Sequence, residues 1–314
     1  MTAAPAAASS QAAPELEPQS KSALERVLLV IFVVLPFLAV LAAVPLAWSA
    51  GFLGWTDAAI FAVFYVVTGL GVTVGYHRYF THGSFKARRP LRIALAVAGS
   101  LSLEMSVIDW VATHRRHHKY SDAEGDPHSP WRFGNDWKAL TKGLFFAHVG
   151  WLFSSERTNR RRYAPDLVAD KDIARVDRNF TWLVVASLLV PALLGGLLTW
   201  SWFGALTAFF WASLVRVSLL HHVTWSINSV CHVFGNEDFT VRDRSRNVWW
   251  LAIPSFGESW HNLHHADPTC ARHGALRGQL DPSARVIRWF EQLGWAHNVR
   301  WPNEERLAAK RARP

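Results

Sequence analysis

Long uncharged hydrophobic runs alternate with charged stretches along the chain, and the lengths of these runs match a lipid bilayer. Val27 to Trp48 comprises 22 residues without a charge and Ala58 to Tyr76 comprises 19, each close to the roughly 20 residues that cross about 30 Å of hydrocarbon. The loop between them carries two glycines and no lysine or arginine, so the pair predicts a helical hairpin. Phe180 to Val215 comprises 36 uncharged residues, too many for one crossing, and Trp200 to Gly204 supplies a break within it. The pattern predicts four transmembrane helices in two hairpins.

Positive charge is concentrated between these runs, and it predicts their orientation. Of the 33 Lys and Arg residues, 2 precede the first run, 18 lie between His77 and Asn179, and 13 lie from Arg216 onward. Because cytoplasmic flanks of membrane helices are enriched in Lys and Arg, we expect both termini and the middle segment in the cytoplasm, with the chain in the cell (inner) membrane. The formal charge of +9 is expected to face membrane lipids or an acidic protein, and no nucleic-acid partner is expected.

These runs divide the chain into five segments, which together predict an all-α integral membrane protein. Residues 1–22, rich in Ala, Pro, Ser and Gln, are expected to be a disordered tail. Residues 23–76 and 180–222 are the two transmembrane hairpins, and residues 77–179 and 223–314 are expected to form a cytosolic helical cap, the latter ending in a basic tail. Leu91–Leu103 and Asn247–Phe256 are apolar but too short to cross a membrane, so each predicts an interfacial or re-entrant segment.

The 15 histidines are clustered, and their spacing predicts metal ligands. Positions i, i+3 and i+4 share a face of an α-helix, so each HxxHH motif is expected to point three imidazoles at one place. His77 and His82 lie about 140° apart by α-helical arithmetic, so we expect the helix to break between them or each ring to serve a different metal. Two HxxHH motifs, one HxxxxH motif and one NxxxH motif supply the candidates, which are His77, His82, His114, His117, His118, His232, His261, His264 and His265, with Asn228.

Nine clustered imidazoles exceed what one ion can hold, so the number favours two metal ions, for which we prefer iron. The HExxH pattern of zinc metalloproteases is absent, and two cysteines exclude a four-thiolate zinc site or an iron–sulfur cluster within the chain. A bis-histidine haem is disfavoured because the clusters lie at the ends of the predicted spans. The remaining histidines are expected to be structural, namely the isolated His148, His273 and His297 and the adjacent His221 and His222.

Acidic residues near the clusters are candidates for orienting the ligands. A ligating imidazole donates its second N–H to a carboxylate or a carbonyl. Glu258 lies three residues before His261 and is the preferred orienting group, while Asp126 and His128 are further candidates. We expect the other nearby acids to be ordinary surface or turn residues, and these are Asp109, Asp122, Glu124 and Asp267.

Five sequence blocks together resemble the membrane-bound fatty acyl desaturases of the Δ9, stearoyl-desaturase-like type, in particular their bacterial and cyanobacterial branch. The blocks are HRYFTH, HRRHHKYSDAEGDPH, FFAHVGW, WSINSVCH and GESWHNLHH, in family order between about Gly75 and Gly274. The resemblance implies a non-haem di-iron oxidoreductase in which the nine histidines hold two irons and Asn228 reaches a metal through water. It implies a mushroom-shaped fold, with four transmembrane helices under the cytosolic cap. The implied reaction is O₂-dependent insertion of a cis double bond, most simply at Δ9, into a saturated acyl chain for unsaturated fatty acid biosynthesis.

The substrate is expected to be recognised by shape along its acyl chain. A saturated chain offers no polar handle, so an apolar tunnel must measure position along it. Trp110, Trp225 and Trp260 are the candidate lining residues.

The carrier of the acyl chain, acyl-CoA or acyl-lipid, stays open at the level of sequence. Animal acyl-CoA members carry an Arg-Asp pair before HxxHH and an Arg-Lys pair after HVGW, where this chain has Ala112-Thr113 and Ser155-Glu156. Arg157 and the run Arg160–Arg162 are substitute candidates for phosphate contacts.

Electrons are expected from a separate donor. The 49 residues after His265 lack the HPGG pattern of a fused cytochrome domain. A ferredoxin or cytochrome-type protein with an NAD(P)H reductase is therefore expected to dock on the basic face.

The alternative enzyme is a histidine-rich di-iron hydroxylase of the alkane or carotenoid type. A metal transporter is the remote alternative, because transporters place their sites near mid-bilayer.

Overall fold

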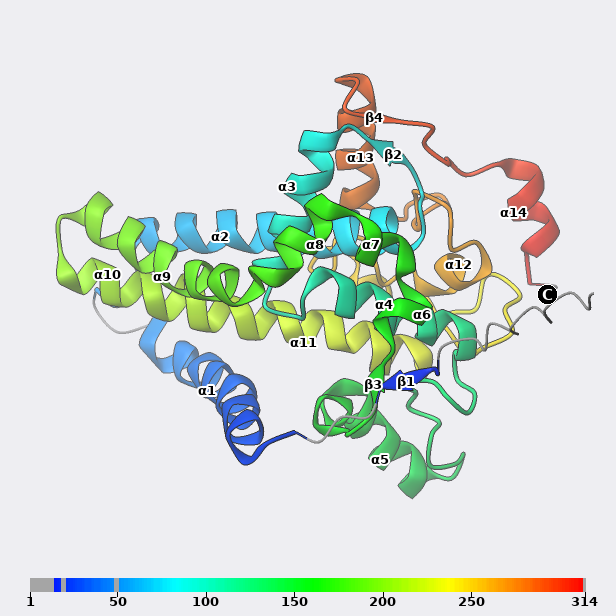
Figure 1. Ribbon diagram of the computed structural model, residues 1–314, viewed down its shortest axis with the longest axis horizontal. Helices are drawn as coiled ribbons and strands as arrows, with labels where there is room; N and C mark the ends of the chain where they lie inside the picture. Colours follow the sequence, from blue (N-terminus) through cyan, green and yellow to red (C-terminus); the bar gives the residue numbers. More distant parts are fainter. Residues whose placement is uncertain (1–13, 18–20, 48–50, 313–314) are drawn as a thin grey trace, which may run out of the picture.

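The computed structural model describes residues 14–17, 21–47 and 51–312, and these residues are mostly helical (Figure 1). Four of the described helices are long and apolar enough to cross a membrane. They are Ala23–Ala47 (α1), Trp55–Thr81 (α2, Trp55–Leu70, continued by the π-helix η1, Gly71–Thr81), Phe180–Thr199 (α9) and Trp202–His232. The last comprises α10 (Trp202–Ala208), the π-helix η3 (Phe209–Val215), α11 (Arg216–Ser229) and η4 (Val230–His232). The prediction of four candidate spans is confirmed, whereas most of the expected disordered tail lies outside the described residues.

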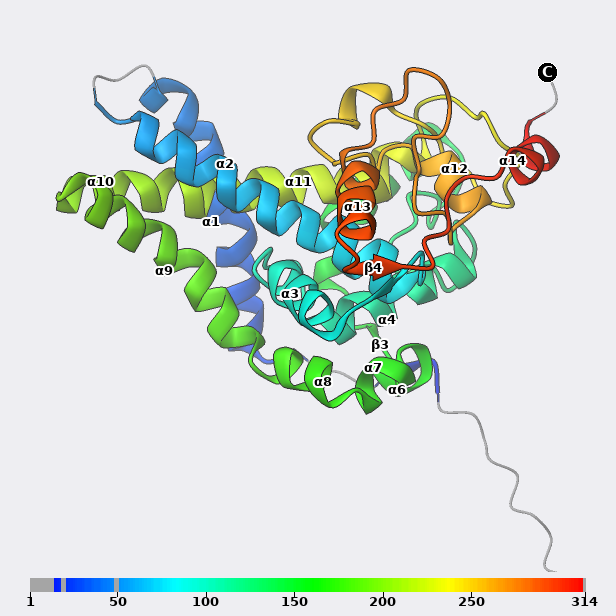
Figure 2. The same ribbon diagram turned by 90° about the horizontal axis from the view of Figure 1, so that it is seen from above.

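The reversal between α9 and α10 occurs within the predicted break, and small residues let the two helices pack closely. Trp200 adopts a φ of 51°, which ends α9, and the Ser201 hydroxyl accepts a hydrogen bond from Phe203 N (3.1 Å) at the start of α10. A Cβ atom on Gly195 would lie 2.3 Å from Cβ of Ala208, so only glycine fits there without displacing the neighbouring helix. In Figures 1 and 2 these helices lie alongside α2, and α1 runs at an angle to them.

The remaining helices gather at one end of the long helices (Figures 1 and 2). The first six of these are α3 (Arg89–Ser100), α4 (Val107–Tyr120), α5 (Trp137–His148), η2 (Gly150–Phe153), α6 (Arg160–Tyr163) and α7 (Pro165–Ala169). They are followed by α8 (Lys171–Arg178), η5 (Trp249–Leu251), α12 (His261–Ala266), α13 (Pro282–Gln292) and α14 (Glu304–Lys310). The first predicted interfacial segment is thus the helix α3, whereas Asn247–Phe256 forms η5 and consecutive turns.

The largest apolar core among the described residues joins η1 to α3, α4, α8 and α13. It holds in place η1 and α4, two of the elements that carry the histidines. Its buried members include Tyr76, Leu95, Val111, Ile173 and Ile287. The Tyr76 hydroxyl shares a hydrogen bond of 2.8 Å with the Ser100 hydroxyl, which ties η1 to the end of α3. Burial of such side chains contributes roughly 1.5–3 kcal/mol each.

Two short antiparallel strand pairs join distant segments to this core. Leu16–Glu17 (β1) pairs with Arg157–Thr158 (β3), and Lys86–Ala87 (β2) pairs with Ala296–His297 (β4). Next to β1, Glu15 accepts hydrogen bonds from Lys119 Nζ (2.6 Å) and the Tyr120 hydroxyl (2.7 Å). The first described residues are thereby held against the end of α4.

Candidate metal centre

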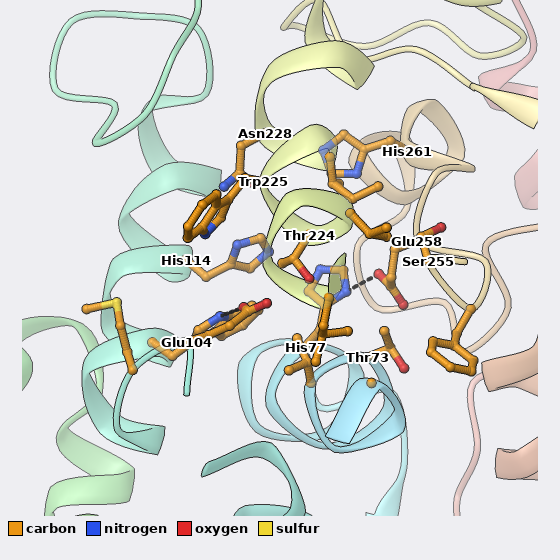
Figure 3. Close-up of a pocket in the computed structure, with 18 of the residues that line it drawn as sticks. Thr73, His77, Glu104, His114, Thr224, Trp225, Asn228, Ser255, Glu258 and His261 are labelled. Carbon is orange, nitrogen blue, oxygen red and sulfur yellow. Dashed lines mark hydrogen bonds and ion pairs between the residues drawn. The ribbon is translucent and has the colours of Figure 1, made fainter. Parts of the chain in front are cut away.

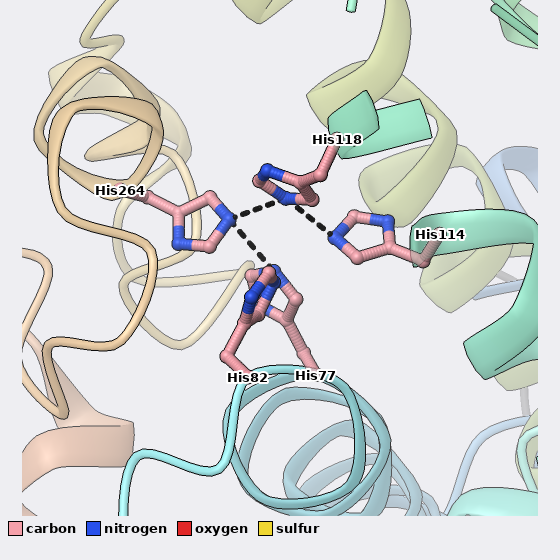
Figure 4. A group of neighbouring side chains, drawn as sticks. All are labelled: His77, His82, His114, His118 and His264. Carbon is pink, nitrogen blue, oxygen red and sulfur yellow. Dashed lines mark hydrogen bonds between the residues drawn. The ribbon is translucent and has the colours of Figure 1, made fainter. Parts of the chain in front are cut away.

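The nine predicted histidines lie on or directly after η1, α4, η4 and α12, and they form two adjacent groups. The five-histidine group comprises His77, His82, His114, His118 and His264, and the four-histidine group comprises His117, His232, His261 and His265. In the first group, Nε2 of His264 lies 3.0 Å from Nε2 of His77 and 2.9 Å from Nε2 of His118 (Figure 4). In the second, Nε2 of His261 lies 3.0 Å from Nε2 of His232 and 3.0 Å from Nε2 of His265. Each group therefore points its ring nitrogens at one place.

A π-helix places His77 and His82 in the same group. The His82 backbone N–H donates to His77 O (3.2 Å), which is the i→i+5 hydrogen bond of a π-turn. The wider turn brings residue i+5 back to the side of residue i, and the two ring centroids lie 4.9 Å apart. The prediction of a helix break or of separate metals for these two residues is therefore wrong. The helix widens instead of breaking.

Each HxxHH motif divides its rings between the two groups. In the first motif, His114 and His118 belong to the five-histidine group and His117 belongs to the four-histidine group. In the second motif, His261 and His265 belong to the four-histidine group and His264 belongs to the five-histidine group. On an α-helix, position i+4 lies about 40° to one side of i and position i+3 about 60° to the other. The prediction that each motif points three imidazoles at one place is wrong, because this 100° difference separates sites that are only a few ångströms apart.

Buried carboxylates accept from the Nδ1 atoms of four of these histidines. Nδ1 of His117 lies 3.0 Å from Asp126 Oδ1, Nδ1 of His232 lies 2.8 Å from Asp122 Oδ2, and Nδ1 of His265 lies 2.8 Å from Asp243 Oδ2. Glu258 pairs in the same way with Nδ1 of His77. Burial alone would raise the pKa of each of the four carboxyls, but the interactions with the adjacent histidines, and with Arg78 at Glu258, hold each pKa below its ordinary value.

The sequence analysis selected two of these four acids and missed the other two. Asp122 was expected to be an ordinary surface or turn acid, and Asp243 was not considered. Asp243 lies 22 residues before the ring that it contacts, so no local spacing relates the two. Glu258 was expected to serve its own sequence neighbourhood, yet its histidine partner among the nine is His77 on η1.

The tautomers that these carboxylates impose make both groups suitable for a cation. A carboxylate at Nδ1 fixes the proton on that atom and leaves Nε2 with a free lone pair. Nε2 of His232 and Nε2 of His265 both face Nε2 of His261, which has at most one proton to donate. Burial lowers the pKa of His261 and His264 well below the ordinary value, so these two rings are neutral at pH 7. Neutral imidazoles that converge through lone pairs fit a transition-metal ion such as iron.

His273 lies against the five-histidine group, although the sequence analysis expected it to be structural and isolated. Its ring is fully buried, and its centroid lies 4.5 Å from that of His264. Its Nδ1 lies 3.4 Å from Glu258 Oε2, the oxygen that also pairs with His77. Arg78, also fully buried, donates Nε to Glu258 Oε1 (3.1 Å) and Nη1 to Asp281 Oδ1 (3.0 Å). His273 and Arg78 therefore hold Glu258 in the position from which it orients His77.

An apolar cavity leads to the histidines between α2, α4 and α11 (Figure 3). Trp110 and Trp225 line it, as expected, and so do Asn228 and His128. The ring of His128 lies 4.5 Å from that of His117. Trp260 is not among the lining residues; its indole N–H donates instead to Leu280 O (2.7 Å).

Glu104 is a carboxyl group inside this otherwise apolar cavity, and the sequence analysis did not identify it. The indole N–H of Trp110 donates to Glu104 Oε2 (3.1 Å), while Oε1 is buried without a hydrogen-bond partner within the described residues. Burial raises the pKa of Glu104 to about 7, although nearby Thr224 and the hydrogen bond from Trp110 both favour its ionised form. The side chain therefore keeps its proton to a much higher pH than an ordinary carboxyl group. Figure 3 shows Glu104 and Thr224 among the residues that line the cavity.

Two other histidines expected to be structural pair with each other away from the nine. Nε2 of His148 on α5 lies 2.9 Å from Nδ1 of His222 on α11, and Nδ1 of His148 lies 3.0 Å from the Ser229 hydroxyl. Nε2 of His221 donates to Ser102 O (2.8 Å). These contacts join helices, as the sequence analysis expected of His221 and His222.

Comparison with known proteins gives the family of the chain. The family model described as Fatty acid desaturase matches residues 53–277, which contain all nine histidines. This chain belongs to the fatty acid desaturase family. The resemblance found in the sequence is therefore confirmed, and the protein is an oxidoreductase of this family.

Curated relatives extend over most of the chain. It is 38% identical over 280 residues to the hex-5-enoyl-[acyl-carrier protein] acetylenase of Moorena producens (strain JHB), covering 88% of this chain and 87% of that protein. It is 39% identical over 254 residues to delta-9 acyl-lipid desaturase 1 of Arabidopsis thaliana, covering 80% and 77%. It is 34% identical over 268 residues to the sn-1 stearoyl-lipid 9-desaturase of Synechocystis sp., covering 84% and 78%.

Proposed function

We propose that this desaturase introduces a cis double bond, at Δ9, into a saturated acyl chain in an O₂-dependent reaction. The observation that carries the proposal is the convergence of nine imidazoles in two adjacent groups beside an apolar cavity. We assign one iron ion to each histidine group, with Asn228 contacting a metal through water. Asn228 lines the cavity on the same helix that leads to His232, which supports this assignment.

The reaction removes one hydrogen from each of two neighbouring methylenes and needs an oxidant that side chains do not supply. Two irons held by the two histidine groups would supply that oxidant together with O₂, and two electrons and two protons from outside would complete the reduction of O₂ to two waters. Trp110 and Trp225 hold the acyl chain by shape and keep water from it, since both line the cavity next to the histidines. Asp122, Asp126, Asp243 and Glu258 hold the Nδ1 protons and thereby fix the ring orientations.

An acyl-lipid is the carrier that the contacts of the arginines favour. Arg157 lies 3.3 Å from Asp109 Oδ1, and Arg160 lies 3.3 Å from the same oxygen and also pairs with Asp177. Arg162 lies 3.4 Å from Glu15. The phosphates of CoA would have to compete with these carboxylates. The plant and cyanobacterial relatives are named acyl-lipid and stearoyl-lipid desaturases, which supports the same carrier.

We further propose that the histidine end of the protein faces the cytoplasm of the cell (inner) membrane, as the cytosolic cap of a mushroom-shaped fold. The distribution of Lys and Arg supports this orientation. Electrons then come from a separate acidic donor, a ferredoxin or a cytochrome-type protein reduced by an NAD(P)H reductase, which docks on the basic face.

Fatty-acid analysis of a host that expresses the chain tests this function. The wild-type protein should yield an acyl product lighter by two hydrogens, whereas His264→Ala, in the five-histidine group, should yield none while still inserting in the membrane. His297→Ala, at the exposed position of strand β4, is the control and should keep full activity. A product heavier by one oxygen would instead indicate the hydroxylase alternative. Metal uptake without O₂ consumption would indicate the transporter, and an active His264→Ala variant would refute the ligand assignment.

A further inference from the structure

The segment from Trp249 to Phe256 presents large apolar side chains to its surroundings. Trp249 is 74% exposed, Trp250 is 55% exposed and Ile253 is 57% exposed. Such a concentration of exposed apolar surface marks a contact with a protein or with lipid. The proposed function makes no use of these three side chains.

The attachment of this segment to α2 gives its depth. The Tyr65 hydroxyl donates to Pro254 O (2.9 Å), and the ring of Phe256 packs against Gly69, where an added Cβ would lie 2.3 Å from the ring. Both positions are inside the candidate span Trp55–Thr81. Side chains on a helix lean toward its N-terminus, so Tyr65 leans away from the histidine end and toward the middle of the span. Pro254 and its neighbour Ile253 are thus level with lipid-facing residues of α2.

Much of the backbone of the segment is hydrogen-bonded internally, which favours contact with lipid. Inside hydrocarbon every backbone polar group needs an internal partner. Pro254 has no N–H, and its carbonyl is taken by Tyr65. The N–H groups that donate to carbonyls within the segment or directly before it are those of Leu251, Ala252, Ser255, Phe256 and Gly257.

The other side of the same segment forms part of the cavity wall. Pro254, Ser255 and Phe256 line the apolar cavity opposite Thr224 of α11, and Ser255 appears with Thr224 among the lining residues in Figure 3. Ile253 on the outside and Ser255 on the inside are only two residues apart. A single layer of chain therefore separates the cavity from the surroundings of α2.

We propose that Trp249–Phe256 is embedded in the acyl region of the membrane leaflet nearest the histidine groups, where it forms the lateral wall of the cavity. Lipid rather than a protein is its partner, because the segment is continuous with the surface of a membrane span. Use of this wall as a lateral entrance for an acyl-lipid rests on the proposed function, whereas the lipid contact itself does not.

Depth-dependent quenching tests the proposal without reference to activity. Trp250→Cys is labelled with a fluorophore, and the full chain is placed in nanodiscs of phosphatidylcholine and phosphatidylglycerol whose acyl chains carry bromine. The native Cys231 and Cys270 are both buried, so a thiol-reactive fluorophore applied in detergent solution, before the protein is placed in nanodiscs, labels the introduced cysteine. Leu193→Cys on the exposed face of α9 is the membrane control, and Ala309→Cys on α14 is the aqueous control.

The acyl bromines should quench the label at position 250 at least half as strongly as the label at position 193. They should leave the label at position 309 unaffected. Quenching at position 250 no stronger than at position 309 would overturn the proposal. A blue-shifted but unquenched label would also overturn it, because protein rather than lipid would then cover the site. Ile253→Cys gives an independent reading if the Trp250 variant does not fold.

Discussion

The two histidine groups are built from the same motifs, yet their rings are held in different ways. In the four-histidine group, His117, His232 and His265 each contact an aspartate through Nδ1. In the five-histidine group, the histidine with a carboxylate contact at Nδ1 among the described residues is His77, through Glu258. The other rings of that group pack on one another and on Trp110, whose ring stacks on His114 at 4.8 Å.

This difference indicates two ways to fix a ligand before metal arrives. Hydrogen bonds to carboxylates fix both the orientation and the tautomer of a ring. Ring packing fixes the orientation alone and leaves the tautomer to the metal. The group with fewer imidazoles therefore has the more strongly predetermined geometry, and removal of carboxylates should affect the two groups unequally.

The largest effect is expected from the pair Asp122→Asn and Asp243→Asn. Together these substitutions remove the carboxylates from two of the four rings in the four-histidine group. Loss of one such partner costs about 10–100-fold in metal affinity or activity, so the double variant should lose at least about 100-fold in turnover. Iron analysis of the purified protein should show less iron per chain than in the wild type.

Asp267→Asn is the matched control for this double variant. Asp267 is equally buried and lies two residues after His265, but it pairs with Arg306 Nη2 (2.5 Å). It should keep wild-type iron content. Equal losses of iron in the control and in the double variant would refute a specific role of the histidine-bound aspartates.

A smaller effect on activity, about tenfold, is expected from Glu258→Gln. The substitution removes the carboxylate from His77 but leaves the packing of the other four rings in place. It also leaves buried Arg78 with one fewer negative partner, so thermal unfolding should show a loss of about 3 kcal/mol in stability. Turnover and melting temperature, measured on one preparation, separate the two consequences. A loss of turnover as large as in the double variant would contradict the unequal dependence of the two groups.

The smallest effect is expected from Glu104→Gln, and it should depend on pH. The folded pKa of about 7 lies above the ordinary carboxyl value of 4.5, so the folded state retains a proton that the unfolded state has lost. Wild-type stability should therefore fall as pH rises from about 4.5 to about 7, by roughly 3 kcal/mol at most, and then level off. Glu104→Gln cannot ionise and should flatten this decline. Thermal melts across that range check it, and identical slopes in the two proteins would contradict a buried, protonated Glu104.

The elements that the sequence predicts well are those whose signal is local and repeated. Uncharged runs located the four candidate spans, and clustered histidines located the nine rings, because each signal lies within one segment. The sequence did not show that each HxxHH motif contributes rings to both histidine groups, because this depends on how the helices that carry the motifs pack against each other. The joint placement of His77 and His82 was missed because α-helical geometry was assumed where the chain forms a π-helix.

The residues that hold the ligands were harder to predict than the ligands themselves. Asp243 and His273 reach the histidine groups through contacts between separate segments. A lone histidine or aspartate in such a segment resembles any surface residue in sequence. Glu104 was missed for the same reason, since its environment is set by the walls of the cavity and not by its sequence neighbours.

Mössbauer spectroscopy of the purified, iron-loaded wild-type protein tests the central claim most directly. Two groups of imidazoles that differ in ligand number should yield two iron sites of equal intensity and different quadrupole splitting, with two irons per chain. A single iron per chain, or no bound iron in a protein that is folded and inserted in membrane, would contradict the claim that these histidines form a two-metal centre.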